Sequence, residues 1–208
     1  MYLTLFTKKN CAYSHSAWIA LEEKNVNCKI EELEDIKDKK KILSLNSDGI
    51  LPILKERENI IFQSEVVMLY INERYPTPPL LPNYAVDRAR KRLIMTKIER
   101  EWYPILNFIK KSSNKKEIDD AKNTLTKSFI AIEPIFSENE FFMSNTMTLA
   151  DCYLSALLYS LLKHGIKLYD ESLTKINDYA KRIFSRESFQ RTISKRNNMK
   201  NKVFEEII

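Results

Sequence analysis

The chain has 208 residues, of which 44% are hydrophobic and 30% charged, and this composition suits a globular protein with its own apolar core. Two Gly and seven Pro leave little room for a hairpin-rich all-β fold, and three widely spaced Cys argue against a disulfide framework. The net charge of +6 is concentrated beyond residue 80, because residues 1–80 carry 11 basic and 12 acidic side chains and the remainder 23 and 16.

No apolar run reaches the roughly 20 residues that a membrane-spanning helix needs, so we expect a cytoplasmic protein without a membrane span. Much of the positive charge lies in residues 88–92 and 181–202. Each cluster is either a solvated helix face or a patch for an acidic partner or phosphate. Nothing in the sequence resembles a zinc finger or an RNA-recognition motif.

The first third of the chain alternates strand and helix patterns. Short apolar or alternating runs predict strands at 2–6, 28–33, 52–55 and 60–62, and the turn at 46–49 separates the second helix from the third strand. Helical patterns follow Cys11, cover 38–45, and extend from Ser64, a good N-cap residue, to a point before Pro76. The predicted order is βαβαββα.

Four prolines between residues 75 and 82 exclude a helix or a central strand there and predict an interdomain linker. Beyond it, apolar residues recur every three or four positions, as in helices. Residues 149–162 are apolar on all sides, which predicts a central buried helix, and Thr148 with Asp151 has the form of a capping box. A last helix around Tyr179 leads into a basic tail. We therefore expect domains at 1–76 and 87–208, joined by a linker at 77–86.

Cysteine and histidine offer few candidates for chemistry. Cys11 precedes a helix, where free amide groups and the helix dipole favour a thiolate, but Ser14 stands where a resolving cysteine would be needed. His15 is a weak candidate base for Cys11, and His164 fits a helix C-terminal cap. Cys28 and Cys152 are expected to pack inertly. No clustered Cys and His spacing predicts a metal site.

Several segments together carry a family resemblance, namely 11–15, 73–82, 98–103, 151–154 and 182–189. With the element order and the proline-rich linker, the chain resembles the glutathione transferase superfamily over nearly its whole length. Within it the chain is similar to bacterial regulators that associate with RNA polymerase. The resemblance implies an α/β plus all-α architecture: a thioredoxin-like N-terminal domain and a C-terminal helical bundle.

The resemblance also implies a glutathione pocket. Leu51-Pro52 would form the cis bond whose backbone pairs with a bound peptide, and Gln63-Ser64 would hold the γ-glutamyl end of glutathione. We expect this pocket to be vestigial and the chain to lack enzyme activity and a resident cofactor. The alternative is a glutathione-dependent transferase or thiol reductase that uses Cys11. An anionic nucleotide is a further candidate ligand, although no glycine-rich phosphate loop exists.

In the similar regulators a Pro-His-Pro element and a nearby Tyr meet RNA polymerase and its sigma factor, and Thr77 departs from that pattern. A proline-rich surface loses little conformational entropy on binding, and basic residues beside it suit promoter phosphates or an acidic polymerase face. The expected partner surface consists of Pro76, Thr77, Pro78, Pro79, Tyr84, Arg88, Arg90 and Lys91. We expect a homodimer, or a heterodimer with a related subunit, that binds the holoenzyme and changes promoter use under starvation or stress.

Overall fold

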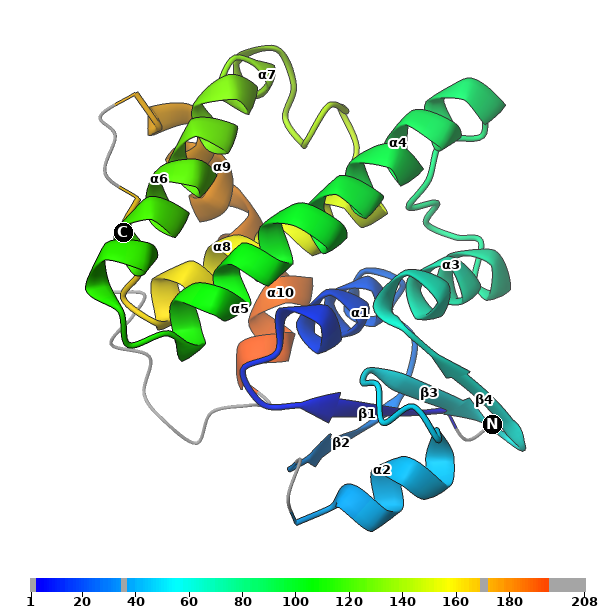
Figure 1. Cartoon of the computed structure of the whole chain (residues 1–208). Coiled ribbons are helices and arrows are strands. Elements are labelled where there is room, and N and C mark those ends of the chain that lie inside the picture. Colours follow the sequence, from blue (N-terminus) through cyan, green and yellow to red (C-terminus); the bar gives the residue numbers. More distant parts are fainter. Residues whose placement is uncertain (1–2, 35–36, 169–171, 195–208) are drawn as a thin grey trace.

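The computed structural model describes residues 3–34, 37–168 and 172–194. Its N-terminal part confirms the predicted βαβαββα order (Figure 1). The bounds are β1 Leu3–Lys8, α1 Ala12–Glu23, β2 Lys29–Leu33, α2 Lys39–Leu45, β3 Ile53–Glu56, β4 Asn59–Phe62 and α3 Ser64–Arg74.

The four strands form one mixed sheet in the order β2-β1-β3-β4, with β1 parallel to β2 and antiparallel to β3. Leu5 of β1 is paired with Ile30 on one side and Leu54 on the other. Because successive side chains of a strand point to opposite faces, Leu5 joins the main core while Phe6 packs in a second cluster with Ile42 of α2. Figure 1 accordingly shows α1 and α3 on one face of the sheet and α2 on the other.

The remaining elements of the described residues are helices, as the helical periodicity predicts. Their bounds are α4 Ala85–Lys97, the π-helical turn η1 Ile98–Trp102, α5 Tyr103–Lys111, α6 Lys115–Ile132, α7 Ile135–Glu138, α8 Leu149–Lys163, α9 Thr174–Ser185 and α10 Glu187–Ser194. The first three are continuous, so residues 85–111 form one long helix interrupted by a wider turn. No helix in the described ranges is long and apolar enough to cross a membrane.

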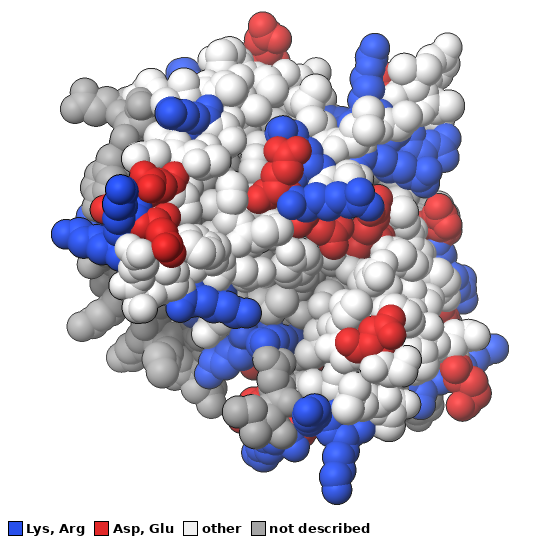
Figure 2. All heavy atoms as spheres, viewed as in Figure 1, with Lys and Arg blue, Asp and Glu red and all other residues white. Residues whose placement is uncertain are grey.

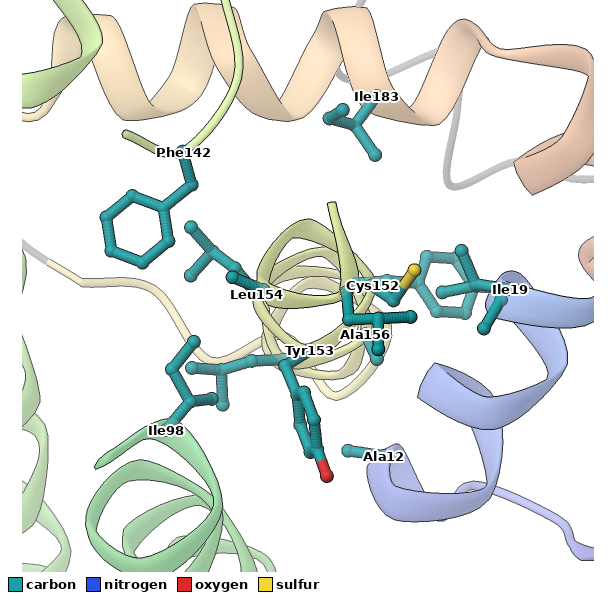
Figure 3. Close-up of a cluster of buried hydrophobic side chains, with 14 of the residues drawn as sticks. Ala12, Ile19, Ile98, Phe142, Cys152, Tyr153, Leu154, Ala156 and Ile183 are labelled. Atoms are coloured by element: carbon teal, nitrogen blue, oxygen red, sulfur yellow. The ribbon is translucent and has the colours of Figure 1, made fainter. Parts of the chain in front are cut away.

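Helix α8 is the buried centre of the bundle, as its apolar composition predicts. Cys152, Tyr153 and Leu154 are fully buried although they point in different directions from the helix axis. Figure 3 shows them meeting different neighbours, with Cys152 toward Ile19 of α1 and Tyr153 between Ala12 and the helix that carries Ile98. Helix α8 therefore joins the N-terminal part to the helical part.

The predicted capping box at the start of α8 is confirmed. The amide and hydroxyl of Thr148 both donate to the Asp151 carboxylate, at 2.8 and 2.7 Å. The same carboxylate accepts the Phe142 amide at 2.7 Å and the Tyr179 hydroxyl at 2.8 Å. Burial raises the pKa of Asp151, while these hydrogen bonds act in the opposite direction. One carboxylate thus ties α8, α9 and the preceding loop together.

The prediction of a single final helix is wrong, since α9 ends at Ser185 and α10 begins at Glu187. Arg186 between them has an extended backbone, with ψ of 138°. Its guanidinium donates twice to the carboxylate of Glu23 on α1, at 2.9 and 2.8 Å. Arg191 similarly pairs with Glu22 at 2.8 Å. Two charges of the expected basic tail are therefore used in ion pairs with α1, and residues 195–208 lie outside the described part of the chain.

Candidate functional site

A cavity of about 610 Å³ lies where the N-terminal part meets the long helix. The expected pocket residues Cys11, Leu51, Gln63 and Ser64 are brought together on its wall, and Leu51-Pro52 has the predicted cis peptide bond. The remaining lining residues are Lys8, Tyr13, Gly49, Ile50, Glu65, Glu99 and Arg100. The outline of the expected pocket is thus present.

Cys11 lines this pocket and lies directly before α1. It is half-buried and occupies the N-cap position, and its carbonyl accepts the amide of His15 at 3.0 Å. Nearby, Lys110 donates to the carbonyl of Asn10 at 2.7 Å, and burial lowers the pKa of this lysine. The three cysteines of the chain are all free thiols, and burial raises the pKa of Cys152 far above its usual range.

His15 does not serve Cys11 in this arrangement. Its imidazole is buried, with Nε2 2.8 Å from the hydroxyl of Thr192 on α10. The ring also packs against Tyr159 and Phe189, with centroids 5.2 and 5.4 Å away. The histidine therefore joins α1 to the C-terminal helices. The other histidine, His164, is the C-cap residue of α8, as predicted.

The floor of the pocket is a network around the carboxylate of Glu99. The buried Ser64 hydroxyl donates to its Oε1 at 2.5 Å, and the buried Tyr153 hydroxyl donates to its Oε2 at 2.8 Å. The prediction that Ser64 is the N-cap of α3 is wrong, because Gln63 is the N-cap residue and Ser64 is already helical. The Ser64 side chain consequently bonds to Glu99, and Gln63 takes a left-handed φ of +68°.

Burial and the acidic residues set the protonation of this network. Burial, reinforced by Glu99, raises the pKa of Tyr13 to about 12. Burial also raises the pKa of Tyr153 well above its usual range, so both phenols remain donors at neutral pH. The pKa of Glu65 is raised, first by burial and then by the nearby charge of Glu99, while Arg100 acts against this shift. The pocket therefore already holds two acidic groups.

The proline-rich segment is exposed but fixed in place. Lys24, at the C-terminal end of α1, is buried and donates to the Pro78 carbonyl and to Oδ1 of Asn72 at 2.9 Å. The same Asn72 oxygen accepts the Leu80 amide at 2.9 Å, and the Leu80 carbonyl accepts the amide of Leu149 at the start of α8 at 2.8 Å. The segment is thus bonded to both parts of the molecule. Burial lowers the pKa of Lys24 to about 8.

The outward residues of the segment and those just beyond it form an exposed strip. Pro76, Thr77, Pro78 and Pro79 are all exposed, and Tyr84 has 73% of its surface accessible. Thr77-Pro78 is a second cis peptide bond. The predicted proline and tyrosine residues are therefore all exposed, and Tyr84 is the N-cap residue of α4.

Lys91 does not belong to this strip, and its inclusion in the expected partner surface is corrected. It is 6% exposed and donates to the carbonyls of Phe142 and Met143 at 2.8 and 2.7 Å. Arg88 and Arg90, on other sides of α4, bond to the Asn83 carbonyl at 2.9 Å and to Asp87 at 3.3 Å. Lys91 is thus buried although the neighbouring Arg88 and Arg90 are half-buried and exposed, a difference that composition alone does not predict.

Charge on this side of the molecule is mixed. Figure 2 shows Lys and Arg atoms gathered at the upper right, over the end that carries α4 in Figure 1, with acidic atoms among them. Arg92 of α4 and Glu73 of α3 approach to 3.8 Å and link the two helices. The surface is therefore a basic patch interrupted by ion pairs. Among the described residues, no three acidic, His or Cys side chains are grouped as a metal site would require.

Sequence reasoning missed three residues that organise these sites, namely Lys24, Glu99 and Tyr153. Two lie in segments that carry the family resemblance, 98–103 and 151–154, but nothing in the one-dimensional pattern assigns them a contact. Lys24 is one of many lysines in a charged sequence. Their roles arise from pairs of residues 35 or more positions apart.

Comparison with known families gives two matches. The description of the glutathione S-transferase N-terminal domain matches residues 10–74, and that of the C-terminal domain matches residues 93–187. Curated relatives named stringent starvation protein A homolog cover most of the chain. Those of Histophilus somni and Coxiella burnetii are 35% and 36% identical over 92% of this chain and 90% and 91% of their own.

Solved structures confirm the fold. FzlA from C. crescentus superposes with a TM-score of 0.85 and 18% identity, covering 98% of this chain and 95% of its own. The holo form of a bacterial zeta-class maleyl pyruvate isomerase gives a TM-score of 0.78 and 23% identity, covering 90% and 95%. At these identities the similarity concerns architecture alone.

Proposed function

Since the chain belongs to the family of stringent starvation protein A homologues within the glutathione transferase superfamily, we propose that it is a non-enzymatic transcription regulator that binds RNA polymerase holoenzyme. It acts in the cytoplasm and alters promoter use under starvation or stress. Binding uses the strip that runs from Pro76 to Pro79 and on to Tyr84, which meets the polymerase and its sigma factor.

The observation that carries this proposal is the combination of exposure and fixation in the proline-rich segment. Its outward side chains are open to a partner, while the backbone is held by Lys24, Asn72 and Leu149. Pre-ordered prolines lose little further freedom on binding, so more of the contact energy remains as affinity. Tyr84 adds a large exposed ring with a hydroxyl, a side chain enriched at binding hot spots.

Thr77 makes this surface differ from the Pro-His-Pro element of similar regulators. A threonine hydroxyl donates and accepts hydrogen bonds but does not titrate near neutral pH. Polymerase binding through this position is therefore independent of the protonation that a histidine would undergo between about pH 5 and 8.

The proposal includes a dimer, because apolar side chains are exposed on α3 and α4. Val66 of α3 is 47% exposed, and Leu93 of α4, which is 70% exposed, lines a hollow together with Ala89. A second copy of the chain would cover these groups, and a related subunit is the alternative partner. A dimer would also double the number of arginines available to promoter phosphates.

Glutathione-dependent chemistry is the second candidate function, and the observation in its favour is that the thiol-bearing residue Cys11 lines the pocket. As a transferase or thiol reductase, the chain would bind glutathione beside this thiol. An enzyme of this kind loses activity in Cys11→Ser, whereas the proposed regulator retains polymerase binding in the same variant.

The test is size-exclusion co-elution with RNA polymerase holoenzyme, with light scattering to report the mass of the bound species. We expect Pro76→Ala, Pro78→Ala and Tyr84→Ala each to weaken co-elution while the circular dichroism spectrum is unchanged. Pro134→Ala, at an exposed proline before α7, is the matched control and should bind normally. Undiminished binding by all three variants would remove this surface from the proposal.

A further inference from the structure

A second hollow lies in the helical part of the molecule, between α6, α8 and α9, on the side away from the sheet (Figure 1). Its volume is about 490 Å³, within the range of about 300–1,000 Å³ that small-molecule sites occupy. Among the described residues it shares no lining residue with the pocket that Cys11 and Ser64 line. The proposed polymerase surface does not include it either.

The interior of this hollow is apolar. Phe129 of α6, Leu161 of α8 and Ile176 of α9 line it, and each is at most 4% exposed. Leu158 and Leu162, which line it from α8, are half-buried, so part of the apolar lining remains accessible to a ligand. Covering apolar surface at a concave site is favourable, because it removes that surface from water.

The end of α8 shapes one wall of the hollow. Gly165 has a left-handed φ of +62°, and the amides of Gly165 and Ile166 donate to carbonyls in the last turn of α8, both at 2.9 Å. These two bonds form the Schellman arrangement, which glycine favours because it has no Cβ. The turn redirects the chain, so that Ile166, Lys167 and Leu168 all line the hollow beside the residues of α8.

Every charged residue in the described lining of the hollow is a lysine. Lys167 follows the turn and Lys181 lies on α9; both are exposed, and Asn177 of α9 adds a side-chain amide. No hydrogen bond or ion pair joins either ammonium to another described residue. Lysine stems lie along apolar surface and keep the charged group at its edge. The hollow therefore combines an apolar interior with two cations that have no partner within the described ranges.

The N-terminal end of α9, which also attracts anions, is already used. The Glu133 carboxylate accepts the amides of Lys175 and Ile176 at 2.5 and 3.2 Å. These amides have no partner within the helix, and such helix ends are common anion sites. An anion at the hollow would therefore meet the lysine ammoniums rather than the helix end.

We propose that this hollow is a binding site for an apolar carboxylic acid, whose hydrocarbon part lies in the interior and whose carboxylate is held by Lys167 and Lys181. The apolar lining disfavours a ligand with many charges, because they would lose hydration without gaining partners, and the two lysines disfavour a cation. Asn177 can donate to the carboxylate from its amide. The inference is independent of polymerase binding.

The experiment is isothermal titration of the full chain with decanoate, decanol and decyltrimethylammonium, each kept below the concentration at which it aggregates. The three probes share a hydrocarbon chain and differ in the charge of the head group. We expect decanoate to bind at one site about tenfold more tightly than decanol, and the cation to bind more weakly than either. Octanoate tests the apolar interior, since each methylene removed should weaken binding about fourfold.

Substitutions locate the site. Lys167→Met and Lys181→Met should each weaken decanoate binding about three- to fivefold and leave decanol binding unchanged, because they remove a charge and keep an apolar stem. Lys175→Met, on the same helix as Lys181 but outside the lining, is the matched control and should bind all probes normally. Ala180→Phe should fill part of the hollow and weaken both decanoate and decanol at least about tenfold.

Equal affinities for decanoate and decanol would overturn the proposal. Unchanged decanoate binding in both lysine variants, or in Ala180→Phe, would do the same, since the ligand would then lie elsewhere. If circular dichroism shows that Ala180→Phe does not fold, Leu162→Gln replaces it, and unchanged binding there would overturn the proposal.

Sedimentation velocity tests a different occupant of the hollow, a second copy of the chain. We expect the mass to be the same with and without decanoate, and an oligomer that dissociates when decanoate is added would overturn the assignment to a small acid. Co-elution with polymerase is measured separately, and its loss or retention bears only on the proposed function.

Discussion

The pocket and the proline-rich strip differ in which of their polar groups are hydrogen-bonded within the protein. In the pocket, the hydroxyls of Ser64 and Tyr153 are satisfied from within by Glu99. In the strip, the internal bonds of Lys24 and Asn72 go to backbone carbonyl and amide groups, which leaves the outward side chains available. The pocket hydroxyls are therefore already hydrogen-bonded inside the protein, whereas the outward side chains of the strip are exposed.

This difference concerns the free-energy cost of leaving a polar group without a partner. A buried donor without an acceptor costs about 1–3 kcal/mol. The Glu99 carboxylate removes this cost, because it accepts hydrogen bonds from the buried hydroxyls of Ser64 and Tyr153. An exposed surface has no such cost, because water satisfies its polar groups. Helix α8 supports both regions, through Tyr153 in the pocket and Leu149 beside the proline-rich segment.

The largest effect on stability is expected at Asp151, at the start of helix α8, because this helix supports both regions. Asp151→Ala removes the common acceptor of four donors at the start of α8. We expect the free energy of unfolding to fall by about 3–5 kcal/mol, less than the sum for separate bonds because the protein relaxes. Urea unfolding followed by circular dichroism measures this loss. Asp120→Ala, on an exposed face of α6, is the control and should change stability by no more than about 0.5 kcal/mol.

The sheet and the start of helix α8 could be predicted from the sequence, whereas the pocket and the proline-rich strip could be predicted only in part. The alternation of apolar residues predicts the sheet, and Thr148 with Asp151 predicts the start of α8, because these signals are local. Glu99 was missed because its contacts depend on a π-helical turn and on residues 35 and 54 positions away. Lys91 was placed on the surface because Arg88 and Arg90 have the same charge, while its partners lie 51 and 52 positions along the chain.

A smaller loss of stability is expected from a substitution that affects the strip but not the pocket. Lys24→Met removes the ammonium that holds the Pro78 carbonyl, and we expect a stability loss of about 1 kcal/mol at pH 7 together with weaker polymerase binding. The pocket and any glutathione titration should be unaffected. Lys29→Met, at an exposed position on β2, is the matched control for both measurements.

The pH dependence of the same variant tests the cause. Lys24 has a pKa of about 8 when folded and an ordinary value of 10.5 when unfolded, so the unfolded chain binds more protons between these values. The contribution of Lys24 therefore makes the free energy of unfolding rise with pH over that interval. Relative to the Met variant, the unsubstituted chain and Lys29→Met should become more stable between pH 8 and 10; parallel curves for all three would contradict the buried position of Lys24.

The smallest structural effect should come from Arg90, an exposed charge on α4 beyond the strip. Its guanidinium is largely exposed and pairs with Asp87 on its own helix, so Arg90→Gln should change stability by no more than about 0.5 kcal/mol. If this side of the molecule meets an acidic face or promoter phosphates, Arg90→Gln should make polymerase association slower and less sensitive to salt, because exposed charges act mainly on the association rate.

Lys91→Met should have the converse effects. It removes an internal donor from two carbonyls, so it should lower the free energy of unfolding by about 1–3 kcal/mol without altering the salt dependence of association. Stopped-flow association at two ionic strengths distinguishes the variants, and an equal salt response in both would mean that Arg90 and Lys91 do not differ as their burial indicates.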